Sequence, residues 1–364
     1  MSRATTVRLD LGALVHNLRR VRAAAPGRRV ATAVKAEGYG HGLLRVARTL
    51  DADAFAVACI EEALTLREAG VDRPILLLEG VFEASELPLC ARHGLAITVH
   101  HPEQVLMLER ARLEYPLRVW LKVDSGMHRL GLQPETVAAI YRRLRNCPAV
   151  VPEMGLMSHL ARADERDCAA TLQQLQTFNA ATAGLPGERS LANSAGILGW
   201  PQTHFDWVRP GIMLYGASPF VDSRAADENL RPVMTLSTRL IAINRLRQGE
   251  AVGYGGTWIC PEDMDVGVAA IGYGDGYPRH APSGTPVLIN GREAALIGRV
   301  SMDMITLDLR RHPAAQIGDP VVLWGEGLPV ERIAQAAGTI SYVLLCGITA
   351  RVRVEVIPTA NLAA

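Results

Sequence analysis

The sequence predicts an α/β protein: a (β/α)₈ TIM-type barrel followed by a mainly-β C-terminal domain. Three observations support this. Short apolar, strand-like runs alternate with helical patterns over roughly the first two hundred residues, the alternation stops after Gly216, and almost every patterned run from residue 230 onward is strand-like. Alternating strands and helices are typical of parallel sheets, and eight such strands favour a closed barrel over an open doubly wound sheet. A chain of 364 residues is also too long for one ordinary core, so two domains are expected.

The chain opens with a strand that leads directly into a helix. Thr5–Leu9 alternates between polar and apolar residues, and Asp10 can cap a helix that continues to about Ala25. Pro26 and Gly27 then end the helix, because both residues disfavour its continuation.

Eight apolar runs of strand length carry the barrel prediction. They lack the clean alternation of strands that have one face in water, and helical patterns fall between most of them. The runs are Arg29–Val34, Ala54–Ala58, Ile75–Glu79, Ala96–His100, Leu117–Asp124, Met154–His159, Ser190–Asn193 and Phe205–Val208. The clearest helical patterns are Glu61–Glu68, Pro102–Arg112, Pro134–Arg145 and Arg166–Ala183.

The pattern changes beyond a polar connector at 217–229. The pair Asn290-Gly291 signals a hairpin turn between two strands, and only Val330–Ala337 looks helical. We therefore predict a barrel domain over 11–229 and a β-rich domain over 230–364. The strand-like runs of the second domain are Val233–Leu246, Val266–Ile271, Pro286–Ile289, Ala294–Ile297, Met304–Leu309, Pro320–Leu323 and Thr349–Val356.

Composition excludes several classes of protein. Lys+Arg 38 and Asp+Glu 37 leave a net charge of +1, which argues against a nucleic-acid binder that works by electrostatics. Six cysteines without a Cys-x-x-Cys pair favour free thiols in a reducing compartment over disulfides or a metal site. Neither a signal peptide nor an apolar run long enough to span a membrane is recognised. We expect a soluble cytoplasmic protein with no bound metal, nucleic acid or membrane.

One lysine lies where the first barrel strand ends. Lys35 follows the run Arg29–Val34 and precedes three glycines spaced two apart, the first of them Gly38. Desolvation beside a core keeps part of a lysine population neutral, which suits Schiff-base formation with an aldehyde. The glycine backbone can approach an anion, and Tyr39 adds a hydroxyl donor. These residues indicate a phosphorylated aldehyde cofactor; the alternative is a surface lysine in a flexible loop.

Five polar residues follow different predicted strands: Lys35, Arg129, His159, Ser194 and Arg209. In barrels of this kind, the C-terminal ends of the strands build the active site, so these side chains are expected to cluster. The donor fork of Arg129 suits a carboxylate, and Ser194 opens a small-residue turn suited to phosphate. The structural alternatives are an ordinary ion pair for Arg129 and a hydrogen-bonded core histidine for His159.

The stretch from Ala31 to Gly42 resembles the pyridoxal-phosphate lysine motif of alanine racemases, and the similarity continues along nearly the whole chain. The resemblance implies pyridoxal 5′-phosphate as cofactor, alanine as substrate and a homodimer with shared active sites. It also implies that the N-terminal strand, within residues 1–10, joins the C-terminal domain. Two phrases resemble the catabolic branch of the bacterial enzymes: His204–Ile212 and Gly276–Pro282. The sequence does not decide whether the cell uses the enzyme to make D-alanine for peptidoglycan or to catabolise alanine.

The resemblance also assigns roles within the barrel. Lys35 carries the cofactor and is one of two bases, Arg129 contacts the cofactor's phenolic oxygen and the substrate carboxylate, and His159 hydrogen-bonds Arg209. Lys122 matches a lysine that in some members is carbamylated and then pairs with the arginine at the position of Arg129; an uncarbamylated lysine in a plain ion pair is equally consistent. The residues implied for the cofactor phosphate are Tyr39, Ser194, the backbone N–H groups of Gly211 and Ile212, and Tyr342 of the second domain.

Arg209 is implied to face the pyridine nitrogen of the cofactor. An arginine cannot give up its proton in a protein, so it can only donate to an unprotonated nitrogen. The ring is then a weaker electron sink than one paired with a carboxylate, which favours return of a proton to Cα. Racemisation requires this return.

The second base is expected in Val252–Trp258, which resembles the family's catalytic tyrosine loop and supplies Tyr254 from the other subunit. A tyrosine with a pKa near ~10 acts as a base only if positive charge lowers that pKa, and we expect Arg209 and His159 to supply the charge. Further residues implied from the partner subunit are Tyr273 at the entrance, Met302, whose N–H meets the substrate carboxylate, and Asp303.

The chain departs from the family pattern at three positions. Val343 replaces a usual glutamate, so the arrangement of polar side chains around it is not implied by the resemblance. Ser301 stands where some members have cysteine, and His128 replaces a smaller residue or asparagine beside Arg129. The rival hypotheses are a broad-specificity or serine racemase on the same fold, a related decarboxylase, and a non-catalytic pyridoxal-phosphate carrier. A crowded entrance with Tyr273 favours a small side chain, and Tyr254 argues against a carrier, which needs no second proton donor.

Overall fold

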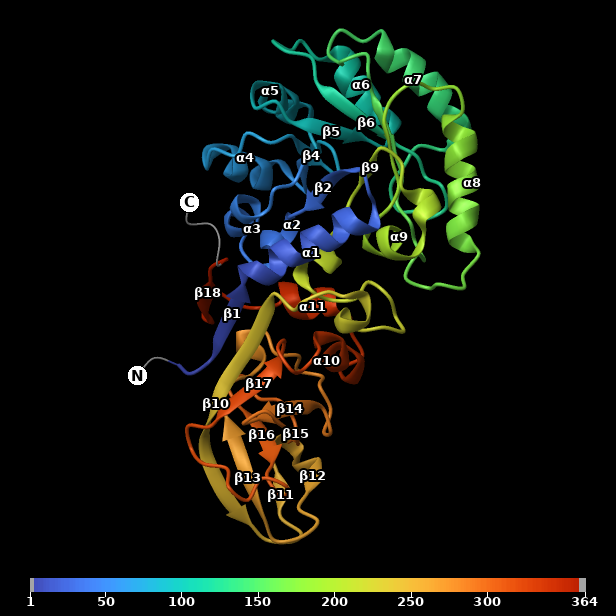
Figure 1. Cartoon of the computed structure of the whole chain (residues 1–364). Coiled ribbons are helices and arrows are strands. Elements are labelled where there is room, and N and C mark those ends of the chain that lie inside the picture. Colours follow the sequence, from blue (N-terminus) through green and yellow to red (C-terminus); the bar gives the residue numbers. More distant parts are fainter. Residues whose placement is uncertain (1–2, 360–364) are drawn as a thin grey trace. The chain divides into compact units, whose positions relative to one another are not determined.

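A computed structural model describes residues 3–359 (Figure 1). Its backbone contacts divide the chain into two compact units. One comprises 17–214 and 219–223; the other comprises the residues up to 16, 215–218 and those from 224 onward. Within the described range, no helix is both long enough and apolar enough to cross a membrane.

The first unit is a closed barrel of eight parallel strands, with β9 paired to β2. Each predicted strand overlaps an observed one, so the barrel prediction is confirmed. The strands are β2 (Arg29–Ala33), β3 (Ala54–Val57), β4 (Ile75–Leu77), β5 (Ala96–Val99), β6 (Arg118–Lys122), β7 (Gly155–Met157), β8 (Arg189–Ser190) and β9 (Trp207–Val208). Half of them are buried along their whole length and the others are exposed or half-buried at no more than two positions, which explains why their sequences do not alternate.

One helix precedes the first barrel strand, and the other helices of this unit lie between successive barrel strands in the chain. The helix α1 (Leu11–Ala24) begins at the cap predicted from the sequence, since the N–H of Ala13 donates to Oδ1 of Asp10 at 3.0 Å. The others are α2 (Lys35–Gly40), α3 (Leu43–Thr49), α4 (Ile60–Glu68), α5 (Leu87–Arg92), α6 (Pro102–Arg110), α7 (Val137–Arg145), α8 (Ala170–Thr182) and α9 (Ser194–Gly199).

The second unit is built on an eight-stranded sheet in the order β13-β16-β15-β14-β17-β10-β1-β18. The N-terminal strand β1 (Thr6–Asp10) lies in this sheet, antiparallel to β10 and parallel to β18. The remaining strands of the sheet are β10 (Met234–Leu246), β13 (Met264–Ala269), β14 (Pro286–Ile289), β15 (Arg292–Ile297), β16 (Ile305–Asp308), β17 (Pro320–Trp324) and β18 (Arg353–Ile357).

Two turns in this unit follow from local sequence. Asn290 and Gly291 both have positive φ, 50° and 76°, and join β14 to β15 as a hairpin, as their sequence predicted. A separate two-stranded hairpin of β11 (Ala251–Val252) and β12 (Trp258–Ile259) carries the loop of Tyr254.

The prediction that Val330–Ala337 is the only helix of the second domain is wrong. Besides α10 (Val330–Ala336), the segment Ser341–Cys346 forms the helix α11. Its buried residues Ser341, Leu344 and Leu345 have helical spacing, but a run of six residues is too short for that period to stand out.

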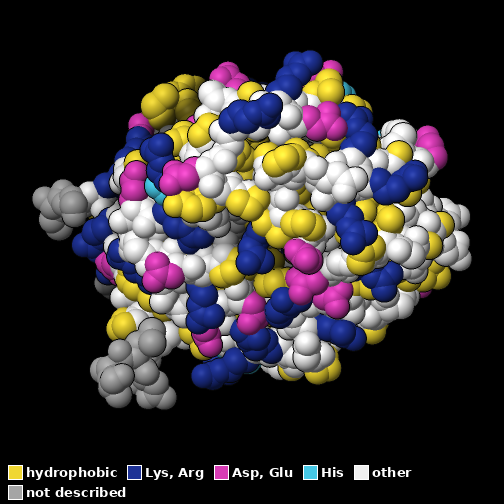
Figure 2. Space-filling view, turned by 90° about the horizontal axis from the view of Figure 1, so that it is seen from above, with side chains coloured by type: hydrophobic (Ala, Val, Ile, Leu, Met, Phe, Trp, Pro, Cys, Tyr) yellow, Lys and Arg dark blue, Asp and Glu magenta, His cyan; other side chains and the backbone are white. Residues whose placement is uncertain are grey.

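Charged side chains of both signs are interspersed over the face of the molecule that Figure 2 shows. This agrees with the near-zero net charge of the chain. The residues that the structure describes contain no group of three or more His, Cys, Asp or Glu side chains arranged to hold a metal ion.

Candidate active site

The backbone after Lys35 is strained. Ala36, Glu37, Gly38 and Tyr39 have φ between 51° and 59° and wind one turn of left-handed helix directly after β2. Each residue that carries a Cβ costs about 1–2 kcal/mol in this conformation. Strain of this kind persists only where the surroundings enforce it, and it gathers at functional sites.

Three side chains enforce the turn. Glu62 of α4 accepts the N–H of Ala36 at 2.7 Å, and Glu37 accepts the N–H of Leu43 at 3.2 Å. His41 is buried with Nδ1 2.8 Å from the carbonyl oxygen of Tyr39. Burial lowers the pKa of His41 to about 4, so this histidine is neutral at physiological pH. Sequence reasoning did not single out Glu62 or His41, because neither stands next to a recognisable motif.

The strained turn brings Tyr39 to the start of α9. A Cβ on Gly211 would lie 2.5 Å from the hydroxyl of Tyr39, so only glycine allows this approach. The N–H of Gly211 donates to Oγ of Ser194 at 2.9 Å, which leaves the Ser194 hydroxyl hydrogen free to donate elsewhere. Together with the adjoining Ile212, these are the barrel residues predicted to hold a phosphate, and the fold places them side by side.

Arg209 follows β9 and is almost fully buried. Its guanidinium donates to the hydroxyl of Ser190 and to the carbonyl oxygens of Ser158 and Leu191. Burial lowers the pKa of Arg209 to about 10, so the side chain stays protonated at neutral pH. Its donors are therefore anchored to the barrel wall.

His159 does not carry the charge that the sequence led us to expect. Its pKa lies well below the ordinary value because of burial, followed by the positive charges of Arg209, Lys122, Arg129 and Lys35. A neutral imidazole supplies no positive charge to a neighbouring tyrosine. The expectation that His159 supplies positive charge to Tyr254 is corrected, and among those two residues only Arg209 is a cation.

Lys122 ends β6 with little of its side chain exposed. Burial, with the charges of Arg209 and Arg129 next, lowers its pKa from 10.5 to about 8. The neutral amine that carbamylation needs is thus present at physiological pH. Lys35 and Lys122 are the only two lysines of the chain, so every lysine lies at the C-terminal end of a barrel strand.

The lowered pKa of Lys122 predicts a pH-dependent stability. Between pH 8 and 10.5 the unfolded chain binds more protons than the folded one, so the free energy of unfolding rises with pH across this window. The rise amounts to about 3 kcal/mol. Urea unfolding of the wild type and of Lys122→Met, compared at several pH values, measures it. Parallel pH profiles of the two proteins contradict the assignment.

Arg129 lies in an exposed loop whose shape is fixed by Asp124. The Asp124 carboxylate accepts the N–H groups of Gly126 and His128 and lies 3.0 Å from Nδ1 of His128. His128 has a φ of 55°, a conformation that the contacts with the same carboxylate hold in place. His128 shapes the loop just before Arg129.

The site carries excess positive charge. Four cations lower the pKa of His159 through their positive charge: Lys35, Lys122, Arg129 and Arg209. Within residues 3–359, none of them forms an ion pair with a carboxylate. The charge of Glu79 raises the pKa of Lys122 from longer range. Such a group of cations, next to the hydroxyls of Tyr39 and Ser194, fits a ligand with phosphate and carboxylate groups. The residues present therefore fit pyridoxal phosphate with an amino acid.

The remaining predicted site residues belong to the second unit and are exposed on it. Gly253 and Gly255 beside Tyr254 lie against Arg299, which precedes the turn of Met302. The exposed fractions of Tyr254, Tyr273 and Met302 are 68%, 40% and 53%. Exposed aromatic and apolar side chains are typical of a contact surface where they gather in one patch. Asp303 and Tyr342 are also partly exposed.

A cavity of about 830 Å³ lies at the opposite end of the barrel. The first residues of several strands line it, among them Arg29, Arg118 and Trp207. Arg209 also lines it, whereas Lys35 and Tyr39 do not. Trp207 and Trp120 pack edge to face there, with ring centroids 6.4 Å apart. Active sites of such barrels lie at the C-terminal ends of the strands, so this cavity is not the candidate site.

Barrel and β unit together define a class of protein: a lysine-based cofactor barrel joined to a β domain with exposed aromatic loops. The chain matches the family model "Alanine racemase, N-terminal domain" over residues 9–219 and the model "Alanine racemase, C-terminal domain" over 233–356. It belongs to the alanine racemase family.

Similar proteins agree with this assignment. The chain is 59% identical to an alanine racemase of Nitrosococcus oceani over 346 residues, which is 94% of this chain and 97% of that protein. It is 54% identical to the protein named "Alanine racemase, biosynthetic" of Escherichia coli, over 97% of this chain and 99% of that one. The crystal structure of a biosynthetic alanine racemase from Pseudomonas aeruginosa matches with a TM-score of 0.96, at 48% identity, over 98% of this chain and 100% of the other.

The comparisons do not support the predicted catabolic branch. Several relatives whose names give a branch are called biosynthetic, in Escherichia and Shigella as well as in Pseudomonas. The phrases His204–Ile212 and Gly276–Pro282 are therefore not reliable marks of a catabolic enzyme.

Proposed function

We propose that this chain interconverts L-alanine and D-alanine as a pyridoxal-phosphate-dependent racemase. The observation that supports the proposal is the strained turn after Lys35, which brings the Tyr39 hydroxyl to Gly211 and Ser194. Lys35 itself is one of four cations that act on His159. Similarity to alanine racemases over nearly the full chain supports alanine as the substrate.

Pyridoxal phosphate, when bound, supplies an aldehyde for the substrate amine and a ring that stabilises negative charge at Cα. Lys35, which follows β2, would be the attachment point, and Tyr39, Ser194, Gly211 and Ile212 would hold the phosphate, with Tyr342 as a further donor. Arg209 would donate a hydrogen bond to the ring nitrogen and stays protonated, and neutral His159 adds no charge.

Two side chains move the proton of Cα. Nζ of Lys35 takes it from D-alanine and returns it on that face, and the phenolic oxygen of Tyr254 does the same on the L face. Arg129 binds the substrate carboxylate from the barrel side, and Met302 and Asp303 bind it from the β domain. Tyr273 narrows the entrance, which favours a small side chain.

The site is shared between two copies of the chain. The exposed residues Tyr254, Tyr273 and Met302 are contributed by the β domain of the partner to the barrel of the first copy. We further propose a division into domains over 11–229 and 230–364, a cytoplasmic location, and a biosynthetic role that supplies D-alanine for peptidoglycan. The biosynthetic relatives support the last point.

The function is tested by supplying cofactor-loaded protein with L-alanine, L-serine and L-lysine in separate reactions. Chiral chromatography then follows the appearance of each D-isomer. D-alanine alone supports the proposal. D-lysine formed at a comparable rate indicates a broad-specificity racemase, and bound cofactor without any D-isomer indicates a carrier.

A further inference from the structure

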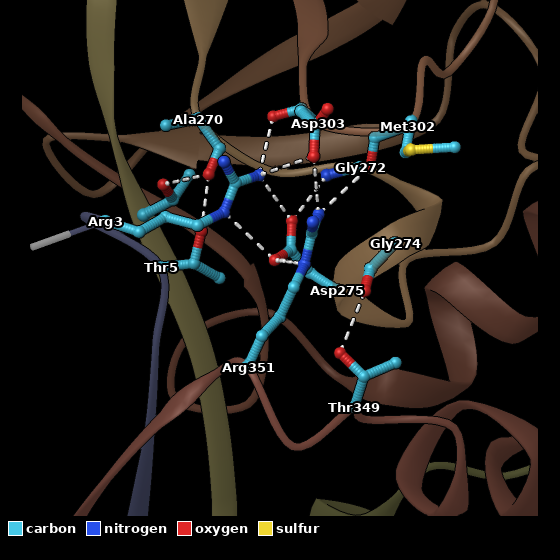
Figure 3. Close-up of polar contacts among 11 residues, drawn as sticks. Arg3, Thr5, Ala270, Gly272, Gly274, Asp275, Met302, Asp303, Thr349 and Arg351 are labelled. Carbon is cyan, nitrogen blue, oxygen red and sulfur yellow. Dashed lines mark hydrogen bonds and ion pairs between the residues drawn. The ribbon is translucent and has the colours of Figure 1, made fainter.

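Two turns of the second unit are joined by a polar network (Figure 3). One is the 3₁₀ turn Tyr273–Asp275, and the other is the segment 301–303 with Met302 and Asp303. The residues that join them come from distant parts of the chain, since Arg3 lies near its start and Arg351 near its end.

Asp275 is the centre of the network. Its side chain is fully buried and accepts from Nε and Nη2 of Arg3 at 3.0 and 2.7 Å, from Nε of Arg351 at 2.8 Å, and from the N–H of Gly272 at 2.9 Å. Burial raises the pKa of Asp275, but these hydrogen bonds outweigh burial, and the pKa lies below its ordinary value. The carboxylate is thus ionised and holds both guanidinium groups in place.

The two arginines also donate hydrogen bonds to the backbone of the second turn. Nη2 of Arg3 donates to the carbonyl oxygen of Asp303 at 2.7 Å, and Nη2 of Arg351 donates to that of Met302 at 3.2 Å. The backbone of the first turn adds two bonds, from Tyr273 to the carbonyl of Ser301 at 3.1 Å and from Gly274 to that of Met302 at 2.9 Å. Three successive carbonyl groups, 301 to 303, therefore point into the network.

This arrangement fixes where the N–H groups of the turn point. In a trans peptide, the N–H is antiparallel to the preceding carbonyl group, and the described chain has no cis peptide bond. Since the carbonyls of Ser301 and Met302 face the network, the N–H groups of Met302 and Asp303 face away from it. Neither N–H has an acceptor within residues 3–359. Two adjacent unbonded N–H groups on one side of a turn are suited to an anion.

We propose that Asp275 is a positioning residue that, through Arg3 and Arg351, aims the N–H groups of Met302 and Asp303 at the carboxylate of the bound amino acid. The inference rests on the proposed function and goes beyond it in two respects. It gives the Asp303 N–H a share in carboxylate binding, and it makes the order of the turn depend on a buried side chain that does not touch the substrate.

The test is Asp275→Asn, which keeps the shape of the side chain but removes its charge. We expect the KM values for L- and D-alanine to rise together by about tenfold or more, with kcat little changed, because the lost interaction serves bound substrate and transition state alike. Inhibition by propionate, which has the carboxylate but no amine, weakens by the same factor. Amide hydrogen exchange of 301–304 becomes faster, while the absorbance of the bound cofactor is unchanged.

Asp308→Asn is the matched control. Asp308 is also a largely buried carboxylate in the same unit, and it accepts from Nε and Nη2 of Arg310, but it makes no bond to the turn. Unchanged KM and propionate inhibition in Asp275→Asn, or equal changes in Asp308→Asn, overturn the inference.

A second variant covers the case in which Asp275→Asn does not fold. Arg351→Gln removes one bond to the Asp275 carboxylate, one to the carbonyl of Met302 and the ion pair with the Asp303 carboxylate, at a side chain that is 38% exposed. It is expected to raise KM and weaken propionate inhibition in the same direction. Wild-type protein that forms no D-alanine overturns the proposed function itself, whereas active wild type with a normal Asp275→Asn and a normal Arg351→Gln overturns only this inference.

Discussion

Lys35→Ala is expected to lose racemase activity by roughly 10⁴-fold or more, because it removes both the attachment point of the cofactor and one of the two bases. The only other lysine, Lys122, is buried at the end of a different strand and does not replace it. The measurement is the rate of D-alanine formation by the variant loaded with cofactor.

The two-lysine composition allows the attachment point to be mapped without a background of other lysines. Borohydride fixes pyridoxal phosphate to the amine with which it has condensed, and peptide mass mapping then identifies that amine. Label on the Lys35 peptide alone is the expected result. Label on the Lys122 peptide in the wild type would contradict this result and assign the attachment of the cofactor to Lys122.

Tyr254→Phe is expected to lower kcat/KM by about 10²- to 10⁴-fold, since it removes the proton carrier on the L face. The two directions of racemisation fall together, because the equilibrium constant between the enantiomers is fixed. The asymmetry therefore appears in exchange of the Cα hydrogen with solvent. In deuterated water, D-alanine still exchanges through Lys35, whereas L-alanine does not.

NMR of each enantiomer over the variant measures this exchange, and Tyr115→Phe, an exposed tyrosine of the barrel unit outside the site, is the control. Equal loss of exchange from both enantiomers would count against two separate bases. Retained exchange from L-alanine would exclude Tyr254 as the base on that face.

Much of the barrel could be predicted from the sequence because its strands are short apolar runs between helical patterns. The positions of Lys35, Arg129, His159 and Arg209 followed from the rule that barrel sites gather at the C-terminal ends of strands. Local signals such as the Asp10 cap and the Asn290-Gly291 turn needed no tertiary information.

Other features depend on burial and on distant partners, which the sequence does not display. The left-handed turn at Ala36–Tyr39 opposes local preference and exists because Glu62 and His41 enforce it. The neutral state of His159 follows from burial among cations. The bond between Arg3 and Asp275 joins residues 272 positions apart, and no sequence pattern predicts such a pair.

The central claim is that each active site combines Lys35 of one subunit with Tyr254 of its partner. Mixed dimers of Lys35→Ala and Tyr254→Phe, made by co-expression, test it most directly. If the site is shared, one of the two sites in a mixed dimer has both catalytic side chains, and random assembly restores about a quarter of wild-type activity. If Lys35 and Tyr254 act within one chain, every site in every dimer carries a defect, and the mixture stays as inactive as its components.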